Sequence, residues 1–415
     1  MKKSTLLLGA FLLLHAGIIV AQNPGCDGNR YINDVFTSVQ KTTVNYAPTV
    51  GHLGNAMMLA MDVYEPQGDN LSARPAVVLA HGGSFVLGDR SQMQTWCELL
   101  AKKGYVAVSI QYRLYPFFQL GFPDSLDIFD TAVKAVGDMR AAVRYLREDA
   151  ATTNQFRIDA NNIFIGGYSA GAVTALHYGY LDEDDDIPAF LQTIIDNNGG
   201  LEGVSGTASN KTYGSSAKAI VNMSGGLYRK EWIDAEELPL TSIHGTNDAT
   251  VNYVYGLAAG IAFLEGSSLL HERAESIGLW NFLETVPGAG HTDLYSGGAQ
   301  YQTYLDTFWN RTSLLLESLS CALVDANEAT LAAEPWSVFP NPNAGNSFTV
   351  QLPASLETAD LKVFDLLGNT VLEMKNIQRQ AVIPMTNLPR GTYMVQIQNS
   401  AHPGLQFKPQ KLIRG

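Results

Sequence analysis

Basic residues are scarce in this sequence, and their scarcity excludes one class of partner. The 415 residues include 27 lysines and arginines against 40 aspartates and glutamates, which gives a formal net charge of −13 at pH 7. A surface of that sign repels polyanions, so we expect no nucleic-acid partner. Charged residues make up only 16% of the chain and hydrophobic residues 46%, which suits one large domain with a buried core and a smaller second domain.

Cysteines are equally few, and they do not indicate a metal site. Cys26, Cys97 and Cys321 are the only three, and none has the spacing of metal ligands. An oxidising compartment permits one disulfide among them and leaves one free thiol, but the sequence does not assign the pair. We predict no bound metal and no cofactor.

Only one long apolar run is present, at the start of the chain. Residues 1–21 begin with Lys2 and Lys3, continue through apolar residues from Leu6 to Val20, and end at a small residue. The run falls short of the roughly 20 apolar residues of a membrane-spanning helix. We therefore interpret it as a cleaved secretory signal peptide and not as a retained anchor. The mature protein is expected to be secreted or on the cell surface, without a transmembrane segment.

Short β-branched runs alternate with helical patterns from about Tyr46 to Val286. This alternation is typical of a doubly wound α/β fold, a mostly parallel sheet with helices on both faces. Apolar spacings of three and four predict a helix over Asp130–Asp149, and a second helix includes Trp96–Leu100. The predicted strands are Ala76–Ala80, Tyr105–Gln111, Ile163–Gly167, Ala219–Met223, Leu240–Ile243 and Phe282–Val286.

The segment Leu181–Lys218 is longer than a connection needs and is rich in Asp, Asn, Gly and Ser. We interpret it as an insertion over the functional edge of the sheet. Its run Asp182–Asp186 lacks the ligand spacing of a calcium loop, so a solvated acidic loop is the better interpretation. If the insertion covers a binding site, its polar composition favours small ligands over long apolar chains.

The composition and the predicted secondary structure of the chain change near Cys321. A linker over 321–334 leads to Pro340–Asn343, after which every predicted element is a short strand between Gly, Asn or Pro turns. We expect a signal peptide (1–21), an α/β domain (22–320), the linker (321–334) and a small all-β, sandwich-like domain (335–415). The strands predicted in the last domain are Phe348–Leu352, Asp360–Phe364, Thr370–Met374, Ala381–Pro384 and Thr392–Gln398.

Ser169 has the sequence context of a catalytic nucleophile. It lies in Gly167-Tyr168-Ser169-Ala170-Gly171, between an apolar strand and the helix-compatible run Ala172–Tyr180. A serine on such a sharp turn holds its hydroxyl out of the sheet, and small flanking residues avoid collisions with the backbone. An ordinary glycine-rich turn is the alternative.

A second glycine-rich loop follows the strand Ala76–Ala80. In His81-Gly82-Gly83-Ser84 the glycines let backbone N–H groups approach a developing oxyanion. We predict that the amides of Gly82, Gly83, Ser84 and Ala170 form an oxyanion hole. For His81 we expect only a supporting role, because a histidine there more often braces its loop than transfers protons.

Asp248 and His291 complete a triad with Ser169. Asp248 lies in His244-Gly245-Thr246-Asn247-Asp248 after one strand, and His291 follows the last strand, so both fall on the edge that carries Ser169. In the order Ser, Asp, His, the imidazole takes the serine proton and the carboxylate fixes the imidazole tautomer. The alternatives are a turn-forming aspartate and a loop histidine. His52, His177, His271 and His402 lack such a context, and we expect them to be structural or surface residues.

These motifs resemble the α/β-hydrolase superfamily, in particular bacterial serine carboxylesterases with an HGG oxyanion loop, including relatives of acetyl-xylan and feruloyl esterases. The resemblance covers about Tyr46 to Thr307 and includes Tyr112-Arg113-Leu114. The hormone-sensitive-lipase branch has a third glycine where this chain has Ser84. The resemblance implies a carboxylic-ester hydrolase acting through an acyl-enzyme, on small or polysaccharide-linked esters. The polar insertion predicts that short acyl or aromatic-acid esters are preferred to long-chain triglycerides. The alternatives are a propeller-free serine peptidase or acyl-peptide hydrolase, and a non-catalytic binding protein on the same fold.

The C-terminal region resembles the sorting domain of the type IX secretion system. The resemblance rests on Phe339-Pro340-Asn341-Pro342, on Gly391-Thr392-Tyr393 and on the basic end Lys411–Arg414. It implies recognition by the secretion machinery, followed by removal or surface attachment. A small carbohydrate-binding or spacer module is the alternative, but Trp336 is the only tryptophan in this region, so it lacks an aromatic platform for sugars.

Overall fold

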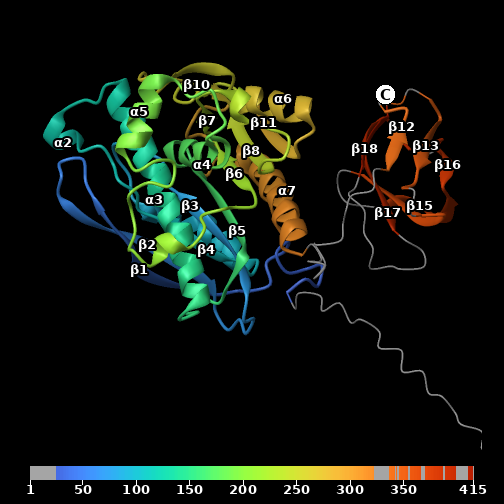
Figure 1. Ribbon diagram of the computed structural model, residues 1–415, viewed down its shortest axis with the longest axis horizontal. Helices are drawn as coiled ribbons and strands as arrows, with labels where there is room; N and C mark the ends of the chain where they lie inside the picture. The colour runs from blue at the N-terminus through green and yellow to red at the C-terminus, as the bar shows by residue number, and fades with distance from the viewer. Residues whose placement is uncertain are drawn as a thin grey trace, which may run out of the picture. The chain divides into compact units, whose positions relative to one another are not determined.

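The computed structural model describes residues 25–321, 336–341, 343, 345–353, 356–365, 370–386, 388–398 and 410–414. They fall into two compact units, one ending near residue 322 and one that follows it (Figure 1). The predicted signal peptide and nearly all of the predicted linker lie outside the described residues. Within the described part of the chain, no helix is both long and apolar enough to cross a membrane.

The first unit is built on an eight-stranded, mostly parallel sheet, which confirms the predicted fold class. The order of its strands across the sheet is β1 (Val39–Val50), β2 (Ala56–Pro66), β4 (Val106–Ile110), β3 (Arg74–Ala80), β5 (Ile158–Tyr168), β6 (Ile220–Met223), β8 (Leu240–Gly245) and β11 (Asn281–Val286). In this order the strands from β4 through β3 to β11 run parallel to one another, and β2 and β1 add an antiparallel edge that was not predicted from the sequence.

Helices cover both faces of this sheet because its strands are apolar on both sides. On β3, Val77 and Leu79 pack with apolar residues of α1 (Gln94–Lys102) and α7 (Gln302–Ser320). Ala76 and Val78 on the opposite face pack with α3 (Ser125–Ala151), α4 (Ala170–Tyr180) and α6 (Ser267–Ile277). The alternation along β3 therefore divides the core into two layers.

Short elements gather above the carboxyl ends of the parallel strands (Figure 1). The insertion after α4 contains α5 (Ala189–Asn197), and α2 (Phe117–Leu120) follows β4. A small antiparallel sheet has the order β7 (Gly226–Leu227), β10 (Ala262–Gly266) and β9 (Tyr255–Ala258). The sequence analysis predicted the insertion but neither α5 nor the β9–β10 hairpin.

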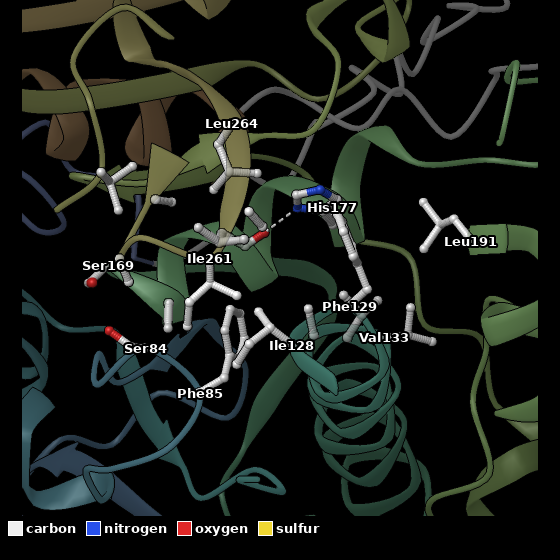
Figure 2. Close-up of a pocket in the computed structure, with 18 of the residues that line it drawn as sticks. Ser84, Phe85, Ile128, Phe129, Val133, Ser169, His177, Leu191, Ile261 and Leu264 are labelled. Atoms are coloured by element: carbon white, nitrogen blue, oxygen red, sulfur yellow. Dashed lines mark hydrogen bonds between the residues drawn. The ribbon is translucent and has the colours of Figure 1, made fainter. Parts of the chain in front are cut away.

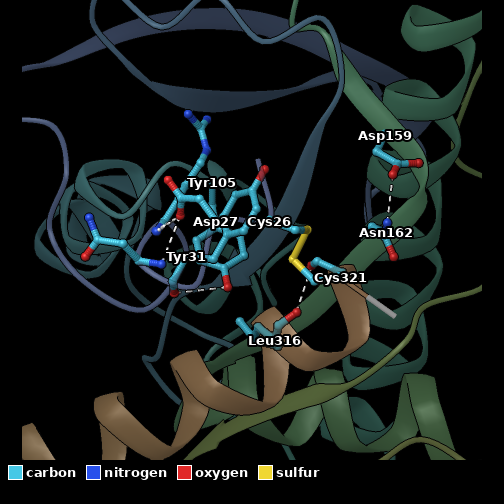
Figure 3. Close-up of a disulfide and its surroundings, with 11 residues drawn as sticks. Cys26, Asp27, Tyr31, Tyr105, Asp159, Asn162, Leu316 and Cys321 are labelled. Carbon is cyan, nitrogen blue, oxygen red and sulfur yellow. Dashed lines mark hydrogen bonds between the residues drawn. A yellow bond between two sulfur atoms is a disulfide. The ribbon is translucent and has the colours of Figure 1, made fainter. Parts of the chain in front are cut away.

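The structure also pairs two of the three cysteines. Cys26 and Cys321 form a disulfide with a Cα–Cα distance of 5.5 Å, which joins the start of the first unit to the end of α7 (Figure 3). Cys97 is the free thiol and is completely buried on α1. The two bonded cysteines are 295 residues apart in sequence, so only the folded chain brings them together.

The second unit consists of two antiparallel sheets that share an apolar core, including Phe348 and Val350 from one sheet and Leu361 and Val395 from the other. One sheet has the order β12 (Ser337–Phe339), β13 (Ser347–Gln351) and β16 (Gln380–Pro384). The other has the order β15 (Thr370–Gln378), β14 (Thr358–Phe364), β17 (Gly391–Gln398) and β18 (Gln410–Arg414). This all-β arrangement confirms the fold predicted for the tail.

Two asparagines near the start of this unit, Asn341 and Asn343, hydrogen bond to its last strand, β18. The side chain of Asn341 donates to the carbonyl oxygen of Lys411 (2.6 Å) and accepts from the amide of Ile413 (2.9 Å). The backbone amide of Asn343 donates to the carbonyl oxygen of Ile413 (2.7 Å). The two sequence features that mark the ends of the tail are therefore in direct contact.

Candidate active site

Ser169 lies at a sharp turn between β5 and α4, with φ 54° and ψ −121°. Such a positive φ is unfavourable for a residue with a Cβ, so the surrounding structure must hold it there. The flanking glycines make this possible. A Cβ on Gly171 would lie 2.0 Å from the carbonyl oxygen of Ala80, and one on Gly167 would lie 2.5 Å from the backbone of Gly171. The spacing of small residues around Ser169 is thus a steric requirement of the turn.

The structure brings together the three residues predicted to form a triad. The hydroxyl of Ser169 donates to Nε2 of His291 at 2.8 Å, and Nδ1 of His291 donates to Oδ2 of Asp248 at 2.6 Å. His291 is partly exposed whereas Asp248 is buried. The three residues come from the ends of three different parallel strands, as their positions in the sequence predict.

Asp248 is held by four donors. Its Oδ1 accepts from the amides of Thr250 (2.8 Å) and Val251 (2.9 Å), and its Oδ2 accepts from His244 (3.2 Å) as well as from His291. Burial alone would raise the pKa of this carboxyl, but the hydrogen bonds from His244 and His291 lower it well below its ordinary value. Asp248 therefore remains a carboxylate at any pH at which a histidine can act as a base.

The predicted oxyanion loop lies close to Ser169 and turns sharply. Gly82 lies so close to the nucleophile that a Cβ on it would be 3.1 Å from Cβ of Ser169. The next turn uses the carbonyl of Gly83 as the acceptor for the amides of Val86 and Leu87. Gly83, Ser84 and Phe85 all have positive φ, respectively 121°, 51° and 63°. Ala170 is the first residue of α4, where a helix N–H has no partner within the helix.

An apolar cavity of about 80 Å³ opens beside Ser169 (Figure 2). Ser84 and Ser169 lie at one end of it, and His177, Val133 and Leu191 lie toward the other. Its walls come from α3, α4, the insertion and the β9–β10 hairpin. The insertion is polar in composition, but it contributes Leu191, Ile195 and Leu201 to the cavity wall. Its composition therefore does not reveal that the side facing the cavity is apolar.

Two family models match the chain. Residues 61–257 match the family described as BD-FAE, and residues 337–408 match the secretion system C-terminal sorting domain. The first unit is an α/β-hydrolase domain. The match to BD-FAE includes Ser169 and Asp248, together with the loop Gly82–Ser84. The second unit is a sorting domain of the type IX kind.

Relatives of the hydrolase domain are esterases. Esterase-5B of Drosophila persimilis is 32% identical over 132 residues, and Esterase P of Drosophila melanogaster is 30% identical over 132 residues. Each match covers 32% of this chain but only 23% of the relative, so the chain spans less than a quarter of their length.

Solved structures of similar fold include that of Thermogutta terrifontis esterase 2 phosphorylated by paraoxon. It is 20% identical with a TM-score of 0.49, and the alignment covers 67% of this chain and 94% of that chain. The propionate-bound form of the T. terrifontis enzyme is 20% identical with a TM-score of 0.46, over 65% of this chain and 93% of that chain.

His81 is buried behind the oxyanion loop of the hydrolase domain. Its Nδ1 lies 2.7 Å from the carbonyl oxygen of Gly82, and its ring stacks on Tyr112 with the centroids 4.4 Å apart. The Tyr112 hydroxyl donates to the carbonyl oxygen of His81 (2.8 Å). Burial lowers the pKa of His81, so the ring stays neutral. These contacts support the predicted bracing of the loop.

Two tyrosines of the hydrolase domain, which the sequence analysis did not select, hold the histidine loop. The Tyr168 hydroxyl donates to the carbonyl oxygen of His291 (3.3 Å), and the two rings stack with centroids 5.3 Å apart. Tyr295 packs against Tyr168 at 4.6 Å and hydrogen bonds to Ser224 (2.8 Å). Burial raises the pKa of Tyr168 to about 12, which keeps its hydroxyl a donor. Because Tyr168 precedes Ser169 in the motif, the sequence indicated that it lies near the serine, but it did not indicate the contact of Tyr168 with His291.

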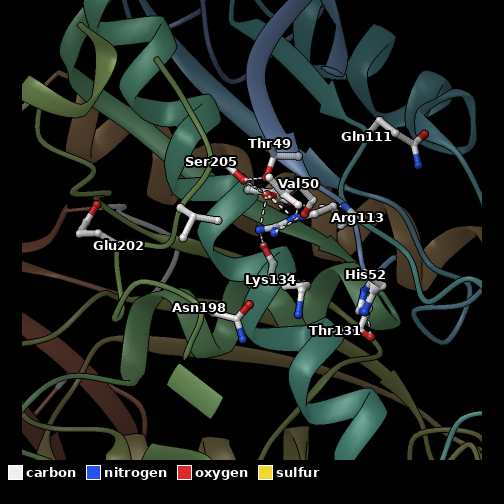
Figure 4. Close-up of polar contacts among 12 residues, drawn as sticks. Thr49, Val50, His52, Gln111, Arg113, Thr131, Lys134, Asn198, Glu202 and Ser205 are labelled. Carbon is white, nitrogen blue, oxygen red and sulfur yellow. Dashed lines mark hydrogen bonds and ion pairs between the residues drawn. The ribbon is translucent and has the colours of Figure 1, made fainter. Parts of the chain in front are cut away.

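A buried ion pair fixes the insertion to the body of the hydrolase domain (Figure 4). Arg113, from the Tyr-Arg-Leu motif, contacts the carboxylate of Asp138 on α3 at 2.9 Å and donates to the carbonyl oxygen of Val50 (3.3 Å). The Ser205 hydroxyl, in the insertion, donates to the same carboxylate and accepts from the hydroxyl of Thr49 (2.7 Å). This network gives the Tyr-Arg-Leu motif a structural role that its sequence did not reveal.

Proposed function

We propose that this protein is an exported serine esterase that hydrolyses carboxylic esters through an acyl-enzyme intermediate. The observation that carries the proposal is the continuous hydrogen-bonded chain from Ser169 through His291 to Asp248, with distances of 2.8 and 2.6 Å. Esterase relatives of the hydrolase domain support the reaction class. The predicted signal peptide and the sorting domain support export.

In the first half of the reaction, Oγ of Ser169 attacks the ester carbonyl carbon while Nε2 of His291 takes the hydroxyl proton. The carbonyl oxygen becomes an oxyanion, and amides of Gly82, Gly83, Ser84 and Ala170 are the proposed donors that stabilise it. The C–O bond to the alcohol then breaks, and Nε2 returns the proton to the leaving alkoxide. The products of this half-reaction are the alcohol and an ester of Ser169.

In the second half, water attacks the acyl-Ser169 carbonyl and gives a proton to Nε2 of His291. The bond to Oγ of Ser169 breaks, Oγ recovers the proton, and the carboxylic acid leaves. Throughout both steps Asp248 holds Nδ1–H of His291, so that Nε2 is the nitrogen that exchanges protons with the substrate. Nothing besides the ester and water is consumed.

The resemblance to acetyl-xylan and feruloyl esterases adds a finer candidate, the acetyl or feruloyl esters of plant polysaccharides. Peptide hydrolysis is a weaker candidate. A free α-amino group is usually bound by a carboxylate, and among the described residues that line the cavity there is no aspartate or glutamate. A purely binding role does not explain why all three triad residues are present in hydrogen-bonding order.

Covalent labelling tests the proposal directly. The purified full chain is treated with an organophosphate such as paraoxon, and its intact mass and tryptic peptides are measured. We expect one phosphoryl adduct, on Ser169, and a matching loss of p-nitrophenyl acetate hydrolysis. The matched control is Ser216→Ala, because Ser216 lies outside the triad and should remain without effect. No adduct, or an adduct on Ser169 without loss of hydrolysis, would contradict the mechanism.

A further inference from the structure

The cavity beside Ser169 has a defined place in the proposed reaction. Ser84, Ser169 and Ala170 border its mouth, whereas His291 is not among the described residues that line it. In the proposed mechanism the leaving alcohol must lie beside Nε2 of His291, which returns its proton, while the carbonyl oxygen faces the amides of Ser84 and Ala170. The remaining substituent of the carbonyl carbon is the acyl chain, and the cavity is the space left for it.

The described lining of the cavity offers few polar partners to a substituted chain. Ser84, Ser169 and Thr250 carry hydroxyls, and His177 is the only other polar side chain among the described lining residues. Nδ1 of His177 donates to the carbonyl oxygen of Val173 (2.8 Å), and its Nε2 accepts from the amide of Tyr228 (3.2 Å) (Figure 2). Burial lowers the pKa of His177 to about 4, so the ring is neutral. Both of its nitrogens are already occupied.

The size of the cavity limits the chain. An apolar cavity that binds the six carbons of benzene has about 150 Å³, roughly twice the volume of this cavity. In proportion, 80 Å³ accommodates about three carbons beyond the ester carbonyl. A feruloyl group carries a hydroxyl, a methoxyl and a propenoyl arm on a benzene ring, so it is larger than benzene.

We propose that this cavity is an acyl-binding site for unsubstituted linear aliphatic acids of about three to five carbons, and that it discriminates against feruloyl and ω-polar acyl groups. The proposal rests on the proposed esterase function and narrows its substrate class. Ala258 and Ala262 make it possible, because they face each other in the β9–β10 hairpin and both line the cavity. Larger side chains at this pair would fill the space that the chain needs.

The first test is a series of p-nitrophenyl esters, from acetate to laurate, on the full-length protein. Each buried methylene should raise kcat/KM by about threefold to fourfold up to butanoate or pentanoate, followed by a fall at longer chains. The ferulate, and a butanoate ending in a carboxylate, should be poorer than plain butanoate. Because the leaving group is constant, these differences report on the acyl side alone.

The second test uses variants of the cavity wall. Ala258→Leu should abolish the advantage of butanoate over acetate in kcat/KM. Its control is Leu257→Ala, a change at the exposed neighbouring residue, which should leave the chain-length profile unchanged. Leu191→Ala removes a buried side chain toward the other end of the cavity and should move the optimum to longer chains, an outcome that misfolding cannot produce.

Failure of this inference is distinguishable from failure of the esterase proposal. If Ser169 is labelled and acetate is hydrolysed, but ferulate is the best substrate or chain length has no effect, the acyl site is wrong and the esterase stands. A profile that follows the length of the alcohol in a series of acetates, and not the acyl chain, also overturns the acyl site. If no ester is hydrolysed and Ser169 is not labelled, the esterase proposal itself fails.

Discussion

His244 and His291 contact the same oxygen, Oδ2, of Asp248, from distances of 3.2 and 2.6 Å. Nε2 of His244 also faces the carbonyl oxygen of Val251 (2.9 Å), and its Nδ1 accepts from the hydroxyl of Ser267 (2.8 Å). The N–H at Nε2 of His244 thus donates to the same carboxylate oxygen of Asp248 that accepts from His291. We infer that it is a positioning residue for Asp248.

Replacing His244 by phenylalanine should reduce kcat and leave KM for p-nitrophenyl acetate almost unchanged. A hydrogen bond to a charged group contributes about 1.5–3 kcal/mol, so the loss of one should lower kcat by roughly 10-fold to 100-fold. His244→Gln keeps a donor in nearly the same place and should recover part of the activity. If kcat falls equally in both variants, or if KM changes and kcat does not, His244 serves only the packing of the domain.

Glu237 predicts a dependence of stability on pH. Burial raises the pKa of its carboxyl to about 8, and the nearby charges of Asp182, Asp185 and Asp234 add to the effect. Its ordinary value is 4.5, so between about pH 4.5 and 8 the folded protein holds a proton that the unfolded chain releases. The folded state loses stability as pH rises through this window. Melting temperature should fall from pH 5 to pH 8.

Glu237→Gln should flatten this fall, because the neutral amide does not titrate. The matched control is Glu236→Gln, at the exposed neighbouring position, which should keep the wild-type slope. Melting curves by circular dichroism at a series of pH values make the comparison. A wild-type slope in Glu237→Gln would remove the proposed role of this carboxyl.

The disulfide should matter for stability and not for catalysis. Cys26 and Cys321 lie 295 residues apart, and losing a native disulfide that closes a long loop costs roughly 2–5 kcal/mol. The double variant Cys26→Ser/Cys321→Ser should therefore melt at a lower temperature while keeping kcat below that temperature.

Thiol titration checks the pairing independently. Without a reductant, no cysteine of the native protein should react with a thiol reagent, since Cys97 is buried and burial raises the pKa of its thiol. The unfolded protein should show one thiol. Three thiols in the unfolded, unreduced protein would contradict the disulfide.

The sorting domain should be dispensable for hydrolysis. All the residues of the candidate site, and every residue that lines its cavity, belong to the first compact unit. Deleting residues 335–415 should leave kcat/KM of the purified protein close to wild type and stop export in the native host. Substitution of Asn341 by alanine in the full chain removes a clamp on the last strand and should impair export alone. A folded truncated protein without activity would show that the two units are functionally joined.

The sequence was sufficient to predict the sheet strands that carry the site, because each triad residue follows an apolar strand within a recognisable turn. It was insufficient for the cavity. The hairpin β9–β10 contains glycines, alanines and exposed aromatics with no clear period, and α5 lies in a segment that reads as polar, so the burial of Leu191 depends on tertiary packing. For the same reason the pairing of Cys26 with Cys321 and the contact of His244 with Asp248 needed the folded chain.

Ser169, His291 and Asp248 should act as one catalytic unit, and kcat of their variants on one activated ester tests this most directly. Ser169→Ala, His291→Ala and the double variant should lose activity to nearly the same extent, because either change removes the covalent route. Asp248→Asn places an amide among four donors and favours the wrong imidazole tautomer, so we expect a loss on the order of 10³ to 10⁴. Circular dichroism should show folded protein in each case. Wild-type turnover by a folded Ser169→Ala protein, or losses that multiply in the double variant, would contradict the claim.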